Sequence, residues 1–249
     1  MQPVLFNIGP LSVHAYGFFL ALAFLLGIFI SLYYAKREGI RSEIVFDLAT
    51  YVILASLVGA RLFYVIGQWD QYRDNLLEIF MVQKGGLVFL GGMLLVMAVV
   101  VWYTRARKIN VFKMLDLITP AAAVGYAITR IGCFLNGCCF GIPTHGPCGV
   151  VFPKTSLAYS YFPGEPLHPT QLYSALIMFF VFLIILFVYH NKKYDGQVFY
   201  WGMVLYSIYR FLVEFIRFSP IHWLWLTPSQ WIVLPIFFWA GYSLLVHKK

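Results

Sequence analysis

Seven apolar stretches of about 20 residues, joined by short connections, restrict the fold of this chain more than any other feature. Inside a bilayer every backbone N–H and C=O must be bonded within the protein, so an apolar stretch of this length is typical of a transmembrane helix. Hydrophobic residues make up 61% of the chain and charged residues only 11%. We therefore predict an all-α, polytopic integral membrane protein with about seven transmembrane helices.

The predicted spans cover most of the 249 residues and leave no room for a soluble domain. They are residues 14–35, 44–68, 87–104, 112–135, 169–189, 197–218 and 228–246. We expect one integral membrane domain, 1–249, with a small external cap at about 140–167. The first span is too long for a signal-peptide core and lacks a small-residue cleavage site, so we expect it to stay in the mature protein.

Basic residues in the connections predict the orientation. One side of the predicted membrane carries Lys36, Arg37, Arg41, Arg105, Arg107, Lys108, Lys113, Lys192, Lys193, Lys248 and Lys249, and the other carries Arg73, Lys84 and Lys154. The richer side is expected to be cytoplasmic, which places the N-terminus outside and the C-terminus in the cytoplasm. The net charge of +8 is scattered over four connections and therefore does not indicate a nucleic-acid site.

Four arginines fall inside the predicted spans: Arg61, Arg130, Arg210 and Arg217. Arg217 lies near a span boundary, where a side chain that reaches back to the membrane surface is an equally good interpretation. The other three fall in the outer halves of their helices, at the level where the odd-numbered helices begin. Guanidinium groups and helix N-termini together favour an anion, and the phosphate of a phospholipid is the anion expected in a membrane.

The sixth predicted span has the clearest internal spacing. Tyr206, Arg210, Glu214 and Arg217 are separated by four, four and three residues, which predicts one helical face with Glu214 paired to a neighbouring arginine. The third span begins with the segment GGLVFLGG, which ends at Gly91 and Gly92. Its glycines indicate either an irregular backbone at a cavity or a close helix crossing.

Several motifs have the order and spacing of a known family. Arg130, Gly132, Asn136, Gly137 and Gly141 match its signature of an arginine, a glycine, an Asn-Gly pair and a final glycine. Further matches are HAYG (14–17), GAR (59–61), GGLVFLGG (85–92), HPTQLY (168–173) and YSIYRFLVEFIR (206–217). Over nearly its whole length the chain resembles the prolipoprotein diacylglyceryl transferases of the bacterial cytoplasmic (inner) membrane.

The resemblance implies an activity and a set of site residues. The diacylglyceryl group of phosphatidylglycerol would pass to the lipobox cysteine of a lipoprotein precursor, releasing glycerol phosphate, with membrane lipids as surroundings and without a cofactor. The catalytic residues it implies are Arg130, Arg210, Tyr206, His14 and Tyr16. The substrate-binding residues are Arg61, Asn136, Gly137, Gly141, Gly91, Gly92, His168, Gln171, Glu214 and Arg217.

One departure from the family pattern leaves the general base unassigned. Leu90 occupies the place of the histidine proposed as base in the family, and leucine cannot move a proton. His14, Tyr16, Tyr206 and His168 are the possible substitutes. Alternatively, arginine electrostatics alone would promote the step. A non-enzymatic phospholipid-binding or transport paralogue is a further interpretation of Leu90.

The cysteines form the second departure. Cys133 and Cys138 replace an asparagine and a glutamate that are frequent in the family, and Cys139 and Cys148 complete the set. The spacing matches no common zinc module, so we predict no metal site. A disulfide among Cys138, Cys139 and Cys148 and a packing role for Cys133 remain open, as does a thiol-redox membrane protein built around Cys138 and Cys139.

Overall fold

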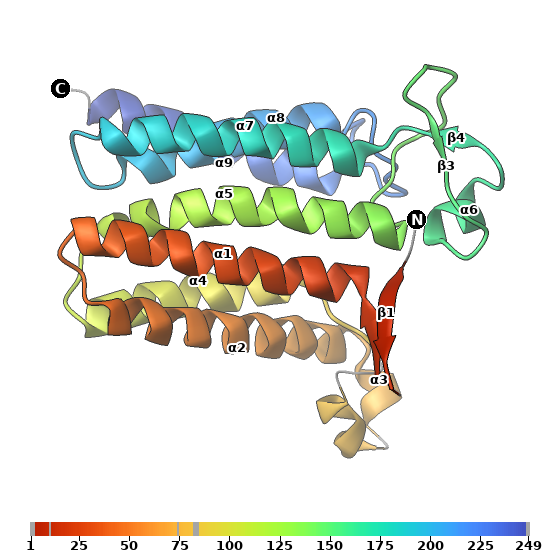
Figure 1. Cartoon of the computed structure of the whole chain (residues 1–249), viewed down its shortest axis with the longest axis horizontal. Helices are drawn as coiled ribbons and strands as arrows, with labels where there is room; N and C mark the ends of the chain where they lie inside the picture. The colour runs from red at the N-terminus through yellow and green to blue at the C-terminus, as the bar shows by residue number, and fades with distance from the viewer. Residues whose placement is uncertain (1–2, 10, 74, 82–84, 248–249) are drawn as a thin grey trace. The chain divides into compact units, whose positions relative to one another are not determined.

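The computed structural model describes residues 3–9, 11–73, 75–81 and 85–247. Lys84, Lys248 and Lys249, which entered the orientation prediction, lie outside the described residues. Figure 1 shows the elements in chain order: β1 (Val4–Ile8), β2 (Leu11–His14), α1 (Ala15–Arg37), α2 (Ser42–Gly67), α3 (Trp69–Tyr72), η1 (Leu76–Phe80), α4 (Phe89–Ala106), α5 (Val111–Asn136), β3 (Val150–Val151), α6 (Leu157–Tyr161), β4 (Pro166–Leu167), α7 (Thr170–His190), α8 (Gln197–Val213) and α9 (Pro228–Val246).

The long helices coincide with the seven predicted spans, and the all-α prediction is confirmed. Five of them, α1, α2, α5, α7 and α9, are long and apolar enough to cross a membrane, and the apolar part of α4 is shorter. Their outward side chains are apolar, as Phe187 of α7 (71% exposed) and Phe238 of α9 (68% exposed) illustrate. Exposed apolar side chains on long helices are expected where lipid, rather than water, is the solvent.

The sixth span was predicted too long. Helix α8 ends at Val213, and residues 214–216 form a turn. The chain leaves the helix because its backbone is bonded elsewhere: Ile142 N–H donates to the Ile216 carbonyl at 3.0 Å, and Phe218 N–H donates to the Phe140 carbonyl at 3.1 Å. Arg217 therefore lies beyond the helix, in a β-bridge with Gly141.

Two compact units make up the structure, one of residues 1–31 and 115–249 and the other of residues 32–114. In the first unit α8 packs on both α7 and α9 (Figure 1). Small residues join the first part of α1 to α5, where a Cβ on Gly27 would lie 3.6 Å from the Cβ of Ala121. Strands β1 and β2 form an antiparallel pair with Val4 opposite His14. The prediction of a single domain stays a prediction.

Residues 140–167 form the expected small cap within the first unit. Strands β3 and β4 pair antiparallel, with Val150 opposite Leu167. Phe140, Phe152, Ala158 and Leu167 make a buried apolar core beneath them. The ring of Phe218 stacks on that of Phe140, with centroids 5.6 Å apart and planes at 9°. The cap is thus an ordered element with its own core, attached to the segment that follows α8.

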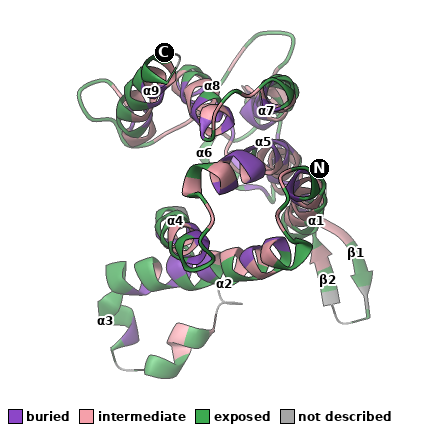
Figure 2. Ribbon diagram, turned by 90° about the vertical axis from the view of Figure 1, so that its left-hand side faces the viewer, coloured by how far each residue is buried: buried purple, intermediate pink, exposed green. Residues whose placement is uncertain are grey.

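The second unit is built on a close crossing of α2 and α4. A Cβ on Gly91 would lie 2.4 Å from the Gly59 carbonyl oxygen, and one on Gly92 would lie 2.8 Å from that of Ser56. Neither distance is compatible with a side chain, so only glycine permits this approach. Gly59, Gly91 and Gly92 are buried, and Figure 2 shows buried backbone where α2 and α4 face each other. For Gly91 and Gly92 the structure therefore supports packing, whereas Gly85 and Gly86 lie in irregular backbone with φ of +84° and +76°.

Candidate active site

Arg130 lies in α5 among three tyrosines of the first unit. Its guanidinium group donates a hydrogen bond to the Tyr126 hydroxyl and lies over the Tyr126 ring, 4.5 Å from the centroid. The Tyr126 and Tyr209 hydroxyls are 3.2 Å apart, and the Tyr126 and Tyr206 rings meet edge to face at 5.8 Å. None of the carboxylates in the described part of the chain forms an ion pair with Arg130. Its positive charge is therefore uncompensated.

Arg210 has a different environment. Its Nη2 lies 3.0 Å from Glu214 Oε2 and donates a hydrogen bond to the Ser229 hydroxyl at 2.8 Å. Arg217 Nη1 lies 3.6 Å from the same Glu214 oxygen. The spacing prediction for this pairing is confirmed, although Glu214 Oε2 accepts no hydrogen bond of good geometry. One almost fully buried carboxylate thus faces two guanidinium groups.

Tyr206 connects the two arginine environments. Its hydroxyl lies within electrostatic range of Arg130, Arg210 and Arg217. A cavity of about 460 Å³ is lined by Glu214 and Arg217, among other residues, but not by Tyr206, Arg130 or Arg210. Three guanidinium groups of the first unit thus lie within electrostatic range of one tyrosine hydroxyl, an arrangement that suits a phosphate group.

Gly141 lies where three segments meet. Its N–H donates to the His168 carbonyl at 2.9 Å, and a Cβ there would lie 2.6 Å from both the His168 Cβ and the Ile216 carbonyl oxygen. Gly137 is similarly restricted, since its φ is +71° and a Cβ would lie 2.6 Å from the Ser156 Cβ. Both signature glycines are thus required by close backbone approach and, for Gly137, by a left-handed conformation.

Buried side chains from the start of α7 fix the segment between these glycines. The Gln171 amide donates to the Cys138 carbonyl at 2.7 Å, and the Thr170 hydroxyl donates to the Cys139 carbonyl at 2.8 Å. Gln171 is completely buried, and Asn136 lies beside the Cys138 thiol. The motif HPTQLY therefore positions residues 137–141, the signature loop, which follows the end of α5.

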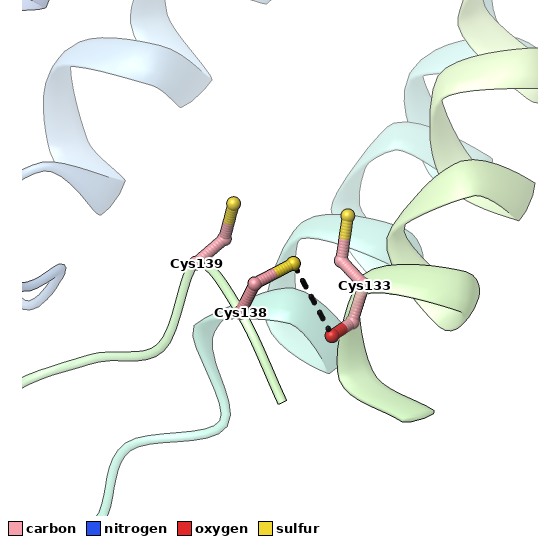
Figure 3. Close-up of side chains that lie close together, drawn as sticks. All are labelled: Cys133, Cys138 and Cys139. Carbon is pink, nitrogen blue, oxygen red and sulfur yellow. Dashed lines mark hydrogen bonds between the residues drawn. The ribbon is translucent and has the colours of Figure 1, made fainter. Parts of the chain in front are cut away.

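The four cysteines carry free thiols in this structure. Cys133, Cys138 and Cys139 gather at the end of α5, with their sulfur atoms all within 4.8 Å of one another (Figure 3). Cys148 is exposed and belongs to no such group among the described residues. The cysteine spacing did not predict this cluster.

The four candidates for the general base lie in different surroundings. Tyr16 lies in the first turn of α1, within electrostatic range of Arg130 and of the clustered thiols. Tyr206 lies between the arginines, as described above. His168 lies against Gly141, and its Nδ1 is buried without a hydrogen-bond partner. His14 is exposed at the end of β2. Of these candidates, Tyr16 and Tyr206 thus lie within electrostatic range of Arg130.

Arg61 belongs to the second unit and has its own set of partners. Its guanidinium group donates to the backbone carbonyls of Glu78, Ile79, Gly85 and Gly86 at 2.6 to 3.2 Å. These bonds engage all three guanidinium nitrogens of a side chain that is 6% exposed. In the structure Arg61 thus holds the segment before α4, and its expected role in substrate binding stays a prediction. Leu90, in the first turn of α4, is 44% exposed.

Comparison with known proteins decides the family. A family model for prolipoprotein diacylglyceryl transferase matches residues 3–246 of this chain. The chain belongs to the prolipoprotein diacylglyceryl transferase family. The resemblance inferred from the motifs is thereby confirmed, and with it the multi-pass membrane architecture of a bacterial transferase.

Relatives support the assignment over the full length. A protein of Finegoldia magna named phosphatidylglycerol–prolipoprotein diacylglyceryl transferase is 35% identical, covering 100% of this chain and 96% of its own length. A protein of Clostridium botulinum with the same name is 32% identical, covering 100% of this chain and 99% of its own. No part of this family member is therefore left without a counterpart in these relatives.

The sequence missed two members of the Arg130 cluster. Tyr126 lies one helical turn before Arg130, and Tyr209 lies three residues after Tyr206, so both spacings were available as signals. Their hydroxyls connect α5 to α8 beside the signature arginine. Which residues of the family member act in catalysis stays a prediction.

Proposed function

We propose that this chain transfers the diacylglyceryl group of phosphatidylglycerol to the lipobox cysteine of lipoprotein precursors, with Arg130 as the principal phosphate ligand. The family and the full-length relatives that carry this activity in their names support the reaction. The observation that supports the assignment of Arg130 is its uncompensated charge in a cluster of tyrosine hydroxyls. An arginine without a carboxylate partner inside a membrane protein favours an external anion.

The reaction itself requires charge stabilisation. The thiol sulfur forms a bond to a glycerol carbon of the lipid, the bond from that carbon to the phosphate oxygen breaks, and the thiol proton is released. The phosphate changes from a diester with one negative charge to a monoester that gains a second. Groups that bind the leaving phosphate more strongly as this charge develops lower the barrier.

The charges of four side chains in the first unit suit the second negative charge that the phosphate gains. Arg130, Arg210 and Arg217 carry three positive charges and Glu214 carries one negative charge, which gives these four side chains a formal charge of +2. Arg210 and Arg217 share the carboxylate, so together they retain one positive charge for a ligand. We assign Arg210 and Arg217 as secondary phosphate ligands and Glu214 as the group that positions both. The formal charge of +2 matches a phosphate monoester better than the diester substrate.

The remaining predicted residues receive roles within the same proposal. Asn136, Gly137, Gly141, His168 and Gln171 shape the loop that borders the phosphate site, for the steric and hydrogen-bonding reasons given above. Tyr16 and Tyr206 are the candidate proton acceptors.

We propose structural roles for two groups of residues that were predicted to bind substrate. We propose that Arg61 holds its segment through backbone carbonyls, and that Gly91 and Gly92 allow the α2–α4 crossing. His14 lies at the strand end before α1, exposed, and remains a weaker candidate for the base.

One assay tests the proposed function against its alternatives. The purified chain is incubated with phosphatidylglycerol and a lipobox peptide, and the thioether-linked lipopeptide and glycerol phosphate are measured. A peptide in which serine replaces the lipobox cysteine is the matched control and should give no product. Lipid retention without any product would instead indicate a phospholipid-binding protein. Turnover that depends on the oxidation state of Cys138 and Cys139 but not on Arg130 would indicate a thiol-redox protein.

We propose further that the N-terminus and the cap lie outside the cytoplasm. The described basic residues Lys36, Arg37, Arg105 and Arg107 support this orientation through the excess of cationic side chains at one end of the spans. Cys148 is exposed on the cap and serves as a reporter. A thiol reagent that does not cross membranes should label Cys148 in intact cells. Labelling only after cell lysis would reverse the orientation.

A further inference from the structure

The thiols of Cys133, Cys138 and Cys139 form a group that the proposed transferase reaction does not use. Cys133 is buried in the last two turns of α5, and the other two residues lie in the loop after the helix. The Cys138 thiol lies 3.7 Å from the Cys133 carbonyl oxygen, and Figure 3 shows all three side chains at the end of this helix. Two of the three thiols thus come from a loop and converge on one from a helix.

The backbone holds this group in place. Cys139 has a φ of +60°, a left-handed conformation that residues other than glycine and asparagine seldom adopt. The carbonyls of Cys138 and Cys139 accept hydrogen bonds from Gln171 and Thr170, both of which are buried. These bonds fix the backbone of Cys138 and Cys139 and offset the local strain. A strained residue fixed by buried partners is typical of a functional position.

The spacing of the sulfur atoms fits a metal ion. Zinc binds thiolate at about 2.3 Å, which places the sulfur atoms of a tetrahedral site about 3.8 Å apart. The three sulfur atoms here are all within 4.8 Å of one another, so a contraction of about 1 Å or less brings them to that geometry. Side-chain rotation suffices for a change of this size. The cysteine spacing alone had indicated no metal site, because the spacing does not reveal the left-handed turn at Cys139.

We propose that Cys133, Cys138 and Cys139 form a three-thiolate site for a thiophilic divalent cation of the zinc type, with the fourth coordination position open to water. Binding replaces three thiol protons by one dication, so the occupied cluster carries a charge of −1. Arg130 and Arg217 lie within electrostatic range of Cys139, so an occupied cluster lowers the formal charge around the phosphate site from +2 to +1. The ion joins the end of α5 to the signature loop and thereby stabilises the border of the phosphate site.

The test uses Cd²⁺ as the probe, because cadmium thiolates absorb in the ultraviolet through charge transfer. The purified full chain, reduced and freed of metal in detergent micelles, is titrated with Cd²⁺. We expect one ion per chain and the release of three protons. Cys133→Ser, Cys138→Ser and Cys139→Ser should each weaken binding by at least ~100-fold, since even second-shell changes cost 10- to 100-fold. Cys148→Ser, which removes an exposed thiol outside the cluster, is the matched control and should bind like the parent.

A second measurement guards against misfolded variants. The thermal unfolding midpoint is recorded with and without Zn²⁺, and the ion should raise it in the parent and in Cys148→Ser but not in the three cluster variants. Equal midpoints without metal show that a cluster variant is folded. The proposal fails if the parent shows no cadmium–thiolate absorption, or if Cys148→Ser loses binding as the cluster variants do. It also fails if two cluster thiols are isolated as a disulfide that persists when the chain is folded and active.

Discussion

A single methyl group at Gly141 tests whether the crossing of three segments beside the arginines is essential. In Gly141→Ala the new Cβ would lie 2.6 Å from the His168 Cβ and from the Ile216 carbonyl oxygen. Ordinary contact begins at 3.4 Å, so both neighbours must move by about 0.8 Å. Both belong to backbone segments that are hydrogen-bonded to this loop, which restricts their movement. Overpacking of this kind costs ~1–3 kcal/mol of stability.

The same displacement should affect catalysis more than stability. Ile216 adjoins Arg217, and a misplacement of about 1 Å at a reacting centre can lower a rate about 100-fold. We expect Gly141→Ala to lower the thermal unfolding midpoint by a few degrees and to slow peptide lipidation by at least ~10-fold. Gly241→Ala is the matched control, because a Cβ on Gly241 meets nothing within 4 Å. If both variants lipidate the peptide at the parent rate, the steric reasoning is wrong.

Three further substitutions test hydrogen bonds in three different parts of the structure. Tyr126→Phe removes the hydroxyl that accepts a hydrogen bond from Arg130, so kcat/KM for lipidation should fall about tenfold, and an unchanged value would contradict that coupling. Arg61→Lys cannot serve four backbone carbonyls with one ammonium group, so the free energy of unfolding should fall by ~2 kcal/mol and residues 76–81 and 85–86 should become sensitive to protease. Unchanged stability would contradict the role of Arg61 in holding this segment. Asp116→Asn keeps one of two acceptors for the N–H groups of Gly196 and Phe199, both at 2.8 Å, and should cost ~1–3 kcal/mol. Lipidation per folded Asp116→Asn molecule should stay at the parent rate, because this residue lies about 21 Å from Arg130 along α5; a slower rate would contradict the separation.

The helices and the ion pairs at the C-terminal end of α8 could be predicted because they depend on local spacing. Apolar runs long enough to span a bilayer gave helix boundaries to within a few residues, except at Val213. There the chain leaves the helix to bond with the segment around Gly141, a partner more than 70 residues away in the sequence. The Glu214 pairs followed from an interval of three to four residues on one helical face.

The candidate site was predicted less completely, because its partners are brought together by tertiary structure. The carbonyls that engage Arg61 lie 17 to 25 residues further along the chain, two of them in the short helix η1 and two shortly before α4. The thiol cluster depends on the left-handed conformation of Cys139, which no spacing rule indicates. Tyr126 is the exception, since its position four residues before Arg130 places it on the same helical face.

Peptide lipidation by Arg130→Gln, compared with the parent and with Arg210→Gln, tests the central claim most directly. Loss of one electrostatic donor to a developing negative charge typically lowers a rate ~100- to 1,000-fold. We predict a loss of this size for Arg130→Gln, in folded protein with an unchanged unfolding midpoint, and a smaller loss for Arg210→Gln because Glu214 already offsets that charge. Product formation by Arg130→Gln at the parent rate would contradict the assignment of Arg130 as the phosphate ligand.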